Sequence, residues 1–314
     1  MAGIPRELKG RSFTRVASWS RHELETLLDL ADELKAERAR RPELRLLPGR
    51  TIGLIFHKPS TRTRVAFEVG IAELGGMALF LPAAELQLAR GESYRDTALV
   101  LSRYLSALMI RTFEQEEVEE FAEHASIPVI NGLTDETHPL QALADAMTLR
   151  ERFGTLEGIR LAYVGDGNNV CHSLMRMAGR FGMEFAAATP PGYEPDQAFV
   201  VAADEDARAT GGSVRVMTDP REAVAGAHAV YTDVWMSMGL EEDRERRLED
   251  LDPYRVDAEL LTLTDAEGVV MHCLPAHVGE EITAEVLYGP RCLAWEQAEN
   301  RLHTQKALMA LVIR

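Results

Sequence analysis

Short apolar runs of strand length alternate with segments of helical periodicity along most of this chain. The runs expected as strands are residues 51–56, 75–81, 107–110, 127–130, 159–164, 183–188, 214–217, 229–233 and 269–271. The segments expected as helices are residues 22–40, one beginning at residue 60 or 61, 93–104, 115–124, 138–153, 168–181, 196–209, 221–227 and 294–312. Strands and helices that alternate at these lengths predict parallel sheets flanked by helices, which is an α/β fold.

Two domains are expected from the length of 314 residues. A glycine-bounded segment, residues 154–158, separates two rounds of the strand–helix alternation. We therefore predict a first domain of residues 1–153 and a second domain of residues 154–293. The C-terminal helix, residues 294–314, is predicted to return to the first domain.

The segment that follows the first strand is dense in hydrogen-bond donors. Residues 56–64 read Phe-His-Lys-Pro-Ser-Thr-Arg-Thr-Arg, so three hydroxyls and two guanidiniums lie within five positions and no acidic residue interrupts them. Pro59 favours a turn, and a helix that begins near Ser60 presents backbone N–H groups and a partial positive charge. The pattern predicts a site for a phosphate dianion. The alternative is an ordinary Ser/Thr helix cap beside solvated arginines.

Polar clusters follow five of the expected strands. They are Arg111, the segment His138-Pro139-Leu140-Gln141, residues 166–169, Asp233, and the segment His272-Cys273-Leu274-Pro275. Ligands of open α/β sheets bind at the carboxyl ends of the strands, so five clusters at this position indicate a shared cleft. Taken singly, each cluster has a structural alternative: an ion pair for Arg111, a helix cap for His138 and a buried structural thiol for Cys273.

The composition excludes some classes of partner. The 34 basic and 50 acidic residues give a net charge of −16, which opposes binding to nucleic acid or to anionic membranes. No apolar run approaches the roughly 20 residues of a membrane span. The three cysteines are odd in number and form no close pair, which predicts free thiols in a reducing compartment. We expect a cytoplasmic protein.

A glycine-rich turn after the strand at 159–164 invites comparison with dinucleotide-binding folds. Gly165 and Gly167 fit the first two positions of that fingerprint, but Val170 replaces the third glycine and two asparagines fill the turn. A pyrophosphate needs bare backbone at that point. A nicotinamide enzyme is therefore the weaker interpretation.

Three motifs together resemble the transcarbamoylase family. Ser60-Thr61-Arg62-Thr63-Arg64 after an apolar strand resembles the family's carbamoyl-phosphate motif, and residues 138–141 resemble its His-Pro-x-Gln motif. Residues 233–239, Asp-Val-Trp-Met-Ser-Met-Gly, are similar to the Asp-x-x-x-Ser-Met-Gly signature of the ornithine branch rather than the aspartate branch. The resemblance extends from about residue 8 to the C-terminus.

The resemblance implies a carbamoyl-phosphate site made by Ser60, Thr61, Arg62, Thr63, Gln87, Arg111, His138, Gln141, Cys273, Leu274 and Arg301. Within this set, Thr63, Arg111 and His138 would direct donors at the carbonyl oxygen, where negative charge grows during the reaction. Gln141 would recognise the carbamoyl N–H. Gln87 matches a residue that the family receives from a neighbouring subunit, which implies a homo-oligomer, typically a trimer.

An ornithine site is implied by the same resemblance and comprises Asn169, Asp233, Ser237 and Met238. The Asp233 carboxylate suits an α-ammonium group, whereas an aspartate substrate would require additional cations. The residues expected to act in catalysis are Arg111, His138, Cys273 and Asp233, with Cys273 orienting groups and handling protons rather than forming a covalent intermediate. His272 receives no assigned role.

The expected activity is transfer of the carbamoyl group of carbamoyl phosphate to the δ-amine of L-ornithine, giving L-citrulline and phosphate in arginine biosynthesis. We expect no cofactor, and no metal site, because the nine histidines show no ligand spacing with cysteines or carboxylates. Two alternatives remain open: a transcarbamoylase for another amine such as putrescine, and a non-catalytic carbamoyl-phosphate-binding protein.

Overall fold

The computed structural model describes residues 7–40, 44–236 and 243–313 and divides into two compact units. Unit 1 comprises Met1–Met147 and Glu299–Arg314, and unit 2 comprises Thr148–Ala298. The divisions fall inside α5 (Pro139–Phe153) and α12 (Ala294–Val312), so each of these helices contributes to both units. The predicted boundaries, at 153/154 and 293/294, lie within six residues of these divisions.

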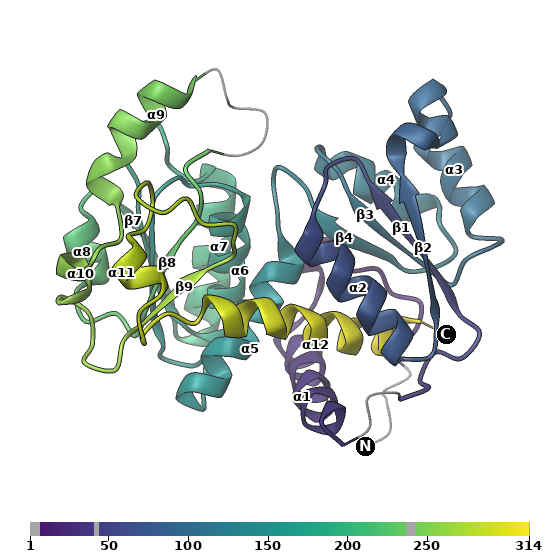
Figure 1. Cartoon of the computed structure of the whole chain (residues 1–314), viewed down its shortest axis with the longest axis horizontal. Coiled ribbons are helices and arrows are strands. Elements are labelled where there is room, and N and C mark those ends of the chain that lie inside the picture. Colours follow the sequence, from purple (N-terminus) through teal and green to yellow (C-terminus); the bar gives the residue numbers. More distant parts are fainter. Residues whose placement is uncertain (1–6, 41–43, 237–242, 314) are drawn as a thin grey trace. The chain divides into compact units, whose positions relative to one another are not determined.

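Unit 1 is built on a four-stranded parallel sheet with the order β2-β1-β3-β4 (Figure 1). The strands are β1 (Thr51–Phe56), β2 (Met77–Pro82), β3 (Ala107–Arg111) and β4 (Val129–Leu133). Chain order reverses between β1 and β3, which is the topological switch point of this sheet. In open α/β sheets, ligands bind outside the carboxyl ends of the strands at this point.

Helices cover the sheet of unit 1. α3 (Tyr94–Leu101) and α4 (Gln115–His124) contribute to an apolar cluster that contains Ile55, Leu108 and Ile110. α1 (Arg21–Arg38), α2 (Thr61–Glu73) and the later turns of α12 pack together. The Glu73 carboxylate joins these three helices, because it accepts from Arg38 of α1 at 2.9 Å and from the buried Lys306 of α12 at 2.6 Å. The predicted return of the C-terminal helix to the first domain is confirmed.

Unit 2 is built on a five-stranded parallel sheet with the order β7-β6-β5-β8-β9. The strands are β5 (Arg160–Val164), β6 (Glu184–Ala188), β7 (Ser213–Met217), β8 (Ala229–Thr232) and β9 (Val269–His272). Chain order reverses between β5 and β8. Unit 2 therefore has a switch point of its own, and the predicted α/β fold class is confirmed.

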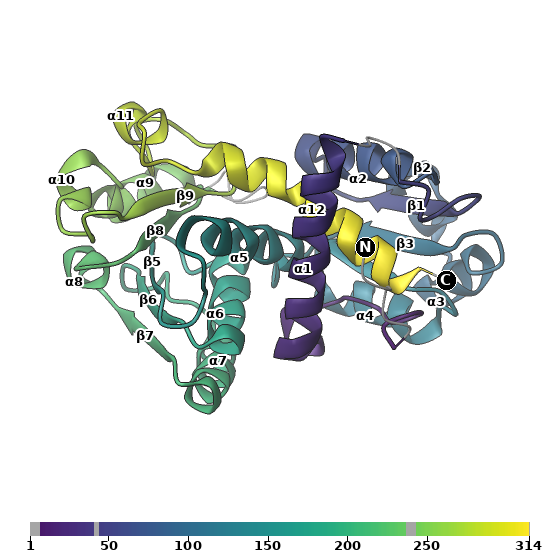
Figure 2. The same cartoon turned by 90° about the horizontal axis from the view of Figure 1, so that it is seen from below.

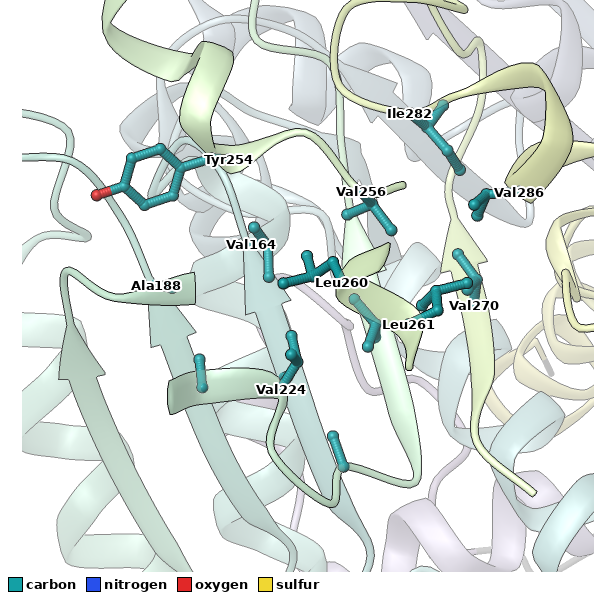
Figure 3. Close-up of a cluster of buried hydrophobic side chains, with 14 of the residues drawn as sticks. Val164, Ala188, Val224, Tyr254, Val256, Leu260, Leu261, Val270, Ile282 and Val286 are labelled. Carbon is teal, nitrogen blue, oxygen red and sulfur yellow. The ribbon is translucent and has the colours of Figure 1, made fainter. Parts of the chain in front are cut away.

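The two faces of the second sheet are covered by different helices. α6 (Asn169–Phe181) and α7 (Gln197–Thr210) lie side by side along one face (Figure 2). The other face carries an apolar cluster that includes Val164, Val230 and Val270 (Figure 3). It is covered by α8 (Pro220–Val224), α10 (Ala258–Leu261) and α11 (Ala284–Leu287), while α9 (Arg244–Leu251) lies in the charged segment 241–252. Residues two apart in a strand point the same way, which explains why Ala162 and Val164 share this cluster.

The largest errors in the expected elements concern short or solvent-facing segments. The strand expected at 127–130 is displaced to Val129–Leu133, and the four-residue helices α10 and α11 were not expected. In α2 the apolar residues Val65 and Val69 are exposed, whereas Phe67 and Ile71 are buried. Residues two apart in a helix lie on nearly opposite faces, so the two pairs alternate. Among the described residues, no helix combines the length and the apolar character needed to cross a membrane. All three cysteines are free thiols.

Candidate active site

The donor-rich segment after β1 forms the first turn of α2 at the switch point of unit 1. Ser60 is the N-cap, in an extended conformation, and its Oγ accepts the Thr63 N–H at 3.3 Å. The first turn contains no acidic residue, so its N–H groups and the helix dipole favour an anion. Thr63 is buried, while Ser60 and Arg62 are half-buried and Thr61 is exposed. The predicted helix start at Ser60 or Thr61 is confirmed, and the binding of an anion there stays a prediction.

Arg64 departs from the expectation that two guanidiniums face this anion site. Its Nε contacts Glu68 Oε1 at 2.8 Å, one turn along the helix. Its guanidinium carbon lies 3.6 Å from the centre of the Phe80 ring on β2. Arg64 therefore stabilises the outer face of α2, and Arg62 supplies the positive charge in the first turn.

Arg301 connects three parts of unit 1 in a buried cluster. Its guanidinium donates to Thr63 Oγ1 at 2.9 Å and to Gln141 Oε1 at 2.8 Å. Gln141 Nε2 donates in turn to Asp145 Oδ1 at 2.8 Å, one turn along α5. Arg301 is only 3 % exposed, although it is separated from Thr63 by most of the chain. The sequence periodicity of α12 alone gave no reason to expect this position.

The charges of three arginines act on the imidazole of His138, and these four residues together with Thr63 and Gln141 are called the His138 cluster. Burial, followed by the charges of Arg301, Arg111 and Arg62, holds the pKa of His138 well below its usual value. The imidazole is therefore neutral at physiological pH and can donate a hydrogen bond without carrying a charge. The guanidiniums that suppress its protonation would themselves attract an anion.

Arg111 lies at an irregularity in the pairing between β3 and β4. The register shifts at Ile110/Arg111, so that Asn131 lies opposite Ile110 and Leu133 lies opposite Arg111, with Gly132 skipped. The extra residue is on β4, so it is β4 that bends opposite Arg111. A Cβ atom on Gly132 would lie 2.4 Å from Met109 Sδ and 3.1 Å from the Ile110 carbonyl oxygen, so a larger residue would force the buried Met109 side chain to shift.

Two further side chains in unit 1 are Gln87, which was predicted as a site residue, and Lys58, which was not. Gln87 lies on an exposed turn, Gln87–Arg90, and no hydrogen bond within the described ranges joins its side chain to the His138 cluster. Lys58, which the sequence did not single out, is buried, forms an ion pair with Asp135 and lies 4.1 Å from the centre of the Phe113 ring. Lys58 thereby links the segment before α2 to the segment before His138.

The switch point of unit 2 carries a second polar cluster, centred on Asp233 after β8. Its Oδ2 accepts from Asn168 Nδ2 at 2.8 Å, and its Oδ1 accepts from Cys273 Sγ at 2.8 Å and from the Val234 N–H at 2.8 Å. Asp233 is nearly buried, whereas Cys273 is half-buried. Three elements, β5–α6, β8 and β9, therefore bring Asn168, Asp233 and Cys273 together.

Asn168 was missed by the sequence reasoning, which selected its neighbour Asn169. Asn168 is the N-cap of α6, and its Oδ1 accepts the N–H groups of Val170 and Cys171 at 2.9 and 3.2 Å. The cap fixes the side chain so that its amide nitrogen points at Asp233. The available signal was the preference of asparagine for the residue immediately before a helix.

The glycines of this turn serve packing. A Cβ atom on Gly167 would lie 2.2 Å from the backbone nitrogen of Pro195, so only glycine allows the two segments to approach. Val170, at the third fingerprint position, is buried in the first turn of α6. Both observations disfavour the dinucleotide interpretation.

An ion pair anchors the segment that leads away from Asp233. Arg247 of α9 donates through Nε to the Trp235 carbonyl at 2.8 Å and pairs with Asp166 through a second nitrogen. Burial raises the pKa of Asp166 to about 6, against the opposing effect of Arg247. The expected ornithine residues Ser237 and Met238, which follow this anchor, lie outside the described residues.

His272, left without a role by the sequence, supports the backbone next to Cys273. Its Nδ1 accepts the Leu274 N–H at 2.8 Å, so the ring proton resides on Nε2, which donates to the buried Glu281 at 3.1 Å. The backbone N–H of His272 donates to Gln297 Oε1 at 2.8 Å. The strand end that carries Cys273 and Leu274 is therefore held from two sides.

Potential metal ligands also gather in unit 2, although the sequence spacing indicated none. One group consists of Asp233, His272 and Cys273, and another of His277, Glu280 and Glu281, with ligand atoms within 4.8 Å of one another in each. In the first group the thiol already donates to Asp233 and His272 already bonds at both nitrogens. In the second, Glu280 pairs with Arg244. Hydrogen bonding and ion pairing account for both arrangements.

Comparison with known proteins places these two clusters in a family context. Residues 11–151 match the family model described as the carbamoyl-P binding domain of aspartate/ornithine carbamoyltransferase, and residues 157–312 match its Asp/Orn binding domain. The chain belongs to the aspartate/ornithine carbamoyltransferase family. The first of these matches contains the His138 cluster apart from Arg301, and the second contains the Asp233 cluster.

The matches to relatives of known name extend over nearly the whole length of this chain. The ornithine carbamoyltransferase of Symbiobacterium thermophilum is 56 % identical over 306 residues, which is 98 % of this chain and 99 % of that protein. The solved ornithine carbamoyltransferase of Pyrococcus furiosus has a TM-score of 0.95 and 48 % identity, with 98 % of each chain covered. An N-acetyl-L-ornithine transcarbamylase variant solved in complex with PALAO is 32 % identical, with a TM-score of 0.87 and coverage of 96 % and 100 %.

Proposed function

We propose that this protein transfers the carbamoyl group of carbamoyl phosphate to the δ-amine of L-ornithine, giving L-citrulline and phosphate. The observation that carries the proposal is the pair of polar clusters, one at the switch point of each sheet. One cluster combines a helix N-terminus with three arginines, as an anion requires, and the other is centred on a carboxylate, as an ammonium group requires. The ornithine carbamoyltransferases among the relatives support the same acceptor.

Most of the residues that we assign to carbamoyl phosphate lie in unit 1. Ser60, Thr61, Arg62 and Thr63 bind the phosphoryl oxygens with hydroxyls, backbone N–H groups and one guanidinium. Arg301 completes this region, and Gln87 is assigned from a neighbouring subunit. In unit 2, Cys273 and Leu274 are assigned to the carbamoyl group.

The carbonyl oxygen of the carbamoyl group is assigned to Thr63, Arg111 and His138. Their donors are most useful when the carbon becomes tetrahedral and charge develops on that oxygen, and each such donor is typically worth about 3 kcal/mol in the transition state. Because Arg301 already fixes Gln141 Oε1, this amide oxygen is oriented to accept the carbamoyl N–H as well. That contact distinguishes a carbamoyl group from an acyl group.

Ornithine is assigned to unit 2. Asp233 pairs with the α-ammonium group, Asn169 binds the carboxylate end, and Ser237 and Met238 complete the site. Asn168 and the Cys273 thiol orient the two oxygens of Asp233, so that the carboxylate presents a fixed geometry to the substrate. Putrescine keeps an ammonium group that could pair with Asp233 but lacks the carboxylate, so it would leave Asn169 without its substrate partner.

The nucleophile is the neutral δ-amine. An alkylammonium has a pKa near about 10.4, so selecting the neutral form at pH 7 costs roughly 4–5 kcal/mol, at about 1.36 kcal/mol per pH unit. The bond from the amine nitrogen to the carbonyl carbon forms, the bond from that carbon to the phosphate oxygen breaks, and the departing phosphate takes up the amine proton. Positioning and electrostatic stabilisation are sufficient for this chemistry.

A homotrimer is part of the proposal. Val65 and Val69 on α2 and Met77 and Leu79 on the edge strand β2 expose apolar side chains in unit 1. Exposed apolar residues beside a free strand edge mark an association surface. The free thiols and acidic composition are consistent with a cytoplasmic enzyme, which we place in arginine biosynthesis.

The test is an acceptor panel analysed by mass spectrometry. The protein is incubated with carbamoyl phosphate and, in parallel, L-ornithine, N-acetyl-L-ornithine, L-aspartate or putrescine. We expect citrulline from ornithine at a kcat/KM at least 100-fold above that for any other acceptor. Preferential carbamoylation of another amine, or binding of carbamoyl phosphate with no product from any acceptor, would refute the proposal.

A further inference from the structure

A buried hydrogen-bond network lies beneath the segment that presents His138. Its centre is Gln115, at the start of α4, which is 1 % exposed. The side-chain oxygen of Gln115 accepts from Thr134 Oγ1 at 2.8 Å, Thr137 Oγ1 at 2.9 Å and Asn131 Nδ2 at 3.2 Å. Its amide nitrogen donates to the Thr14 carbonyl at 3.3 Å and to Glu119 at 3.2 Å. One amide group therefore joins the N-terminal segment, α4, the end of β4 and the following turn.

The turn held by this network leads directly into His138. The Thr134 N–H donates to the Thr137 carbonyl at 2.9 Å, and the Thr137 N–H donates to Thr134 Oγ1 at 3.1 Å. The Asp135 N–H donates to the Phe113 carbonyl at 2.8 Å. Both threonines also donate to Gln115, so the position of the residue preceding His138 depends on the Gln115 oxygen.

The same network fixes the end of β4 opposite Arg111. Asn131 donates from Nδ2 to the Thr14 carbonyl at 2.9 Å and to Thr137 Oγ1 at 3.0 Å, in addition to Gln115. Asn131 is the last residue paired with β3 before the register shift, and the Thr112 N–H donates to the Leu133 carbonyl beyond it at 3.0 Å. The network thus also holds the part of β4 that pairs with the end of β3, where Arg111 lies.

Burial of so many polar groups needs a reason, because apolar residues of similar size would fill the same space without hydrogen bonds. Hydrogen bonds in a buried network have directional requirements that favour one conformation, whereas apolar packing tolerates small displacements. We propose that Gln115 is a positioning residue of the carbamoyl transfer reaction, acting through Asn131, Thr134 and Thr137 on Arg111 and His138. This inference rests on the proposed function.

Gln115→Leu is the direct test, because leucine keeps the volume and removes every hydrogen bond of the amide. Displacement of a catalytic donor by about 1 Å can cost 100-fold in rate, so we expect kcat for citrulline formation to fall 10- to 100-fold. The inhibition constant of inorganic phosphate, used as a probe of the Ser60–Thr63 region, should change less than threefold. A loss confined to kcat is what a donor acting mainly in the transition state produces.

Two threonine variants form a matched pair. Thr137→Val removes one donor to Gln115, and we expect a 3- to 10-fold fall in kcat. Thr210→Val removes a threonine hydroxyl that donates to the Gly179 carbonyl at 2.6 Å, at the C-terminal end of α7 and away from the carboxyl ends of the strands. We expect Thr210→Val to leave kcat unchanged even where it lowers the thermal unfolding midpoint.

A double variant separates positioning from stability. In Gln115→Leu/Thr137→Val a donor and its acceptor are both replaced by apolar groups, which removes the penalty of an unsatisfied hydroxyl. We expect the unfolding midpoint to recover part of the loss seen in Gln115→Leu, while kcat stays low. Recovery of kcat in parallel with the midpoint would assign Gln115 a purely structural role and overturn the proposal.

The remaining outcomes are also decisive. Wild-type kcat in Gln115→Leu, or a phosphate inhibition constant that rises in step with the loss of kcat, would refute positioning. If Gln115→Leu does not fold, Thr137→Val decides, and an unchanged kcat in that variant refutes the proposal. Absence of citrulline with the wild-type protein would reject the proposed function and this inference together, whereas active wild type with unimpaired variants would reject this inference alone.

Discussion

At the scale of single residues, the environment of each side chain differs from what its neighbours in the sequence suggest. Arg62 and Arg64 are two positions apart, yet their roles differ. The charge of Arg62 helps to lower the pKa of His138, whereas Arg64 pairs with Glu68 on the outer face of α2. Asn168 and Asn169 are adjacent, yet Asn168 caps α6 and bonds Asp233. Local sequence identifies the chemistry of such segments, but helix geometry decides which of two similar residues faces the site.

The Cys273 thiol is predicted to orient Asp233 rather than to act as a nucleophile. Cys273→Ser keeps a donor for Asp233 Oδ1, and we expect at most a 10-fold loss in kcat/KM for ornithine. Cys273→Ala removes one of the two donors to Asp233 Oδ1 and leaves the Val234 N–H. Since a hydrogen bond to a charged group is worth roughly 1.5–3 kcal/mol, the expected loss is about 10- to 100-fold. The control is Cys292→Ala, which removes a buried thiol elsewhere in unit 2 and should change kcat/KM less than threefold.

Steady-state kinetics of the three variants, with mass spectrometry of the intact protein during turnover, check this prediction. A carbamoylated enzyme intermediate, or a serine variant as impaired as the alanine variant, would contradict the orienting role.

The pH dependence is predicted to follow the substrate amine. Because its pKa is near about 10.4, kcat/KM for ornithine should rise with pH above pH 7, close to tenfold per unit until the α-ammonium group that pairs with Asp233 begins to lose its proton. Burial and three arginines hold the pKa of His138 well below its usual value, so His138 is already neutral across this range and adds no second break. Initial rates at low ornithine concentration check this, and a profile that is flat or falls from pH 7 upwards would contradict it.

At the scale of elements, alternation of strands and helices was sufficient to predict both parallel sheets. Most strand bounds agree with the structure to within two residues, because the buried strands are continuous apolar runs. The failures have physical causes. α10 and α11 span four residues each and present too few positions for a periodic pattern, and β4 is extended by Gly132 and Leu133, where the register with β3 shifts.

The candidate site could be predicted only in part, because some of its residues come together only when the chain folds. Residues next to strand ends, such as Arg111 and Asp233, are recognisable from their position in the alternation. Arg301 is not, because its burial depends on α12 packing against α2 and α5 within unit 1. The Gln115 network is similarly hidden, since its members are ordinary polar residues until the fold brings them together.

The turn before α6 offers a test at this scale. In Gly167→Ala the added Cβ would collide with the backbone of Glu194 and Pro195, and overpacking of this kind costs about 1–3 kcal/mol. We expect a lower thermal unfolding midpoint together with a higher KM for ornithine, because Asn168 is displaced from Asp233. Thermal unfolding and steady-state kinetics measure both effects.

Gly192→Ala is the matched control for Gly167→Ala. Gly192 has a φ of +89° and open space around its Cβ position, so alanine introduces backbone strain of about 1–2 kcal/mol without a collision. It should lower the midpoint and leave the KM for ornithine unchanged. An equal rise in KM for both variants would show that general destabilisation, rather than displacement of Asn168, is responsible.

At the scale of the whole molecule, association of subunits is predicted to involve the exposed apolar side chains of α2 and β2. We expect the wild-type protein to elute with three times the mass of one chain in size-exclusion chromatography with light scattering. Val65→Asp/Met77→Asp places charges on side chains that are 51 % and 60 % exposed, and it should dissociate the oligomer and lower activity. Val201→Asp, at a 48 % exposed position on α7 in unit 2, should preserve both the mass and the activity.

A monomeric wild-type protein with full activity would contradict both the trimer and the assignment of Gln87 from a neighbouring subunit. Dissociation caused equally by Val201→Asp would locate the association surface elsewhere.

The central claim is that the buried cluster around Arg301 and His138 is the carbamoyl-phosphate site. The most direct test is kcat/KM for carbamoyl phosphate in Arg301→Met and Arg64→Met, two variants that remove the same charge from unit 1. Arg301 donates to Thr63 and Gln141 within the cluster, so its loss should lower kcat/KM by about 10²–10³, whereas Arg64 faces Glu68 and Phe80 and its loss should change kcat/KM less than threefold. Equal effects of the two variants, or wild-type kcat/KM in Arg301→Met, would contradict the account.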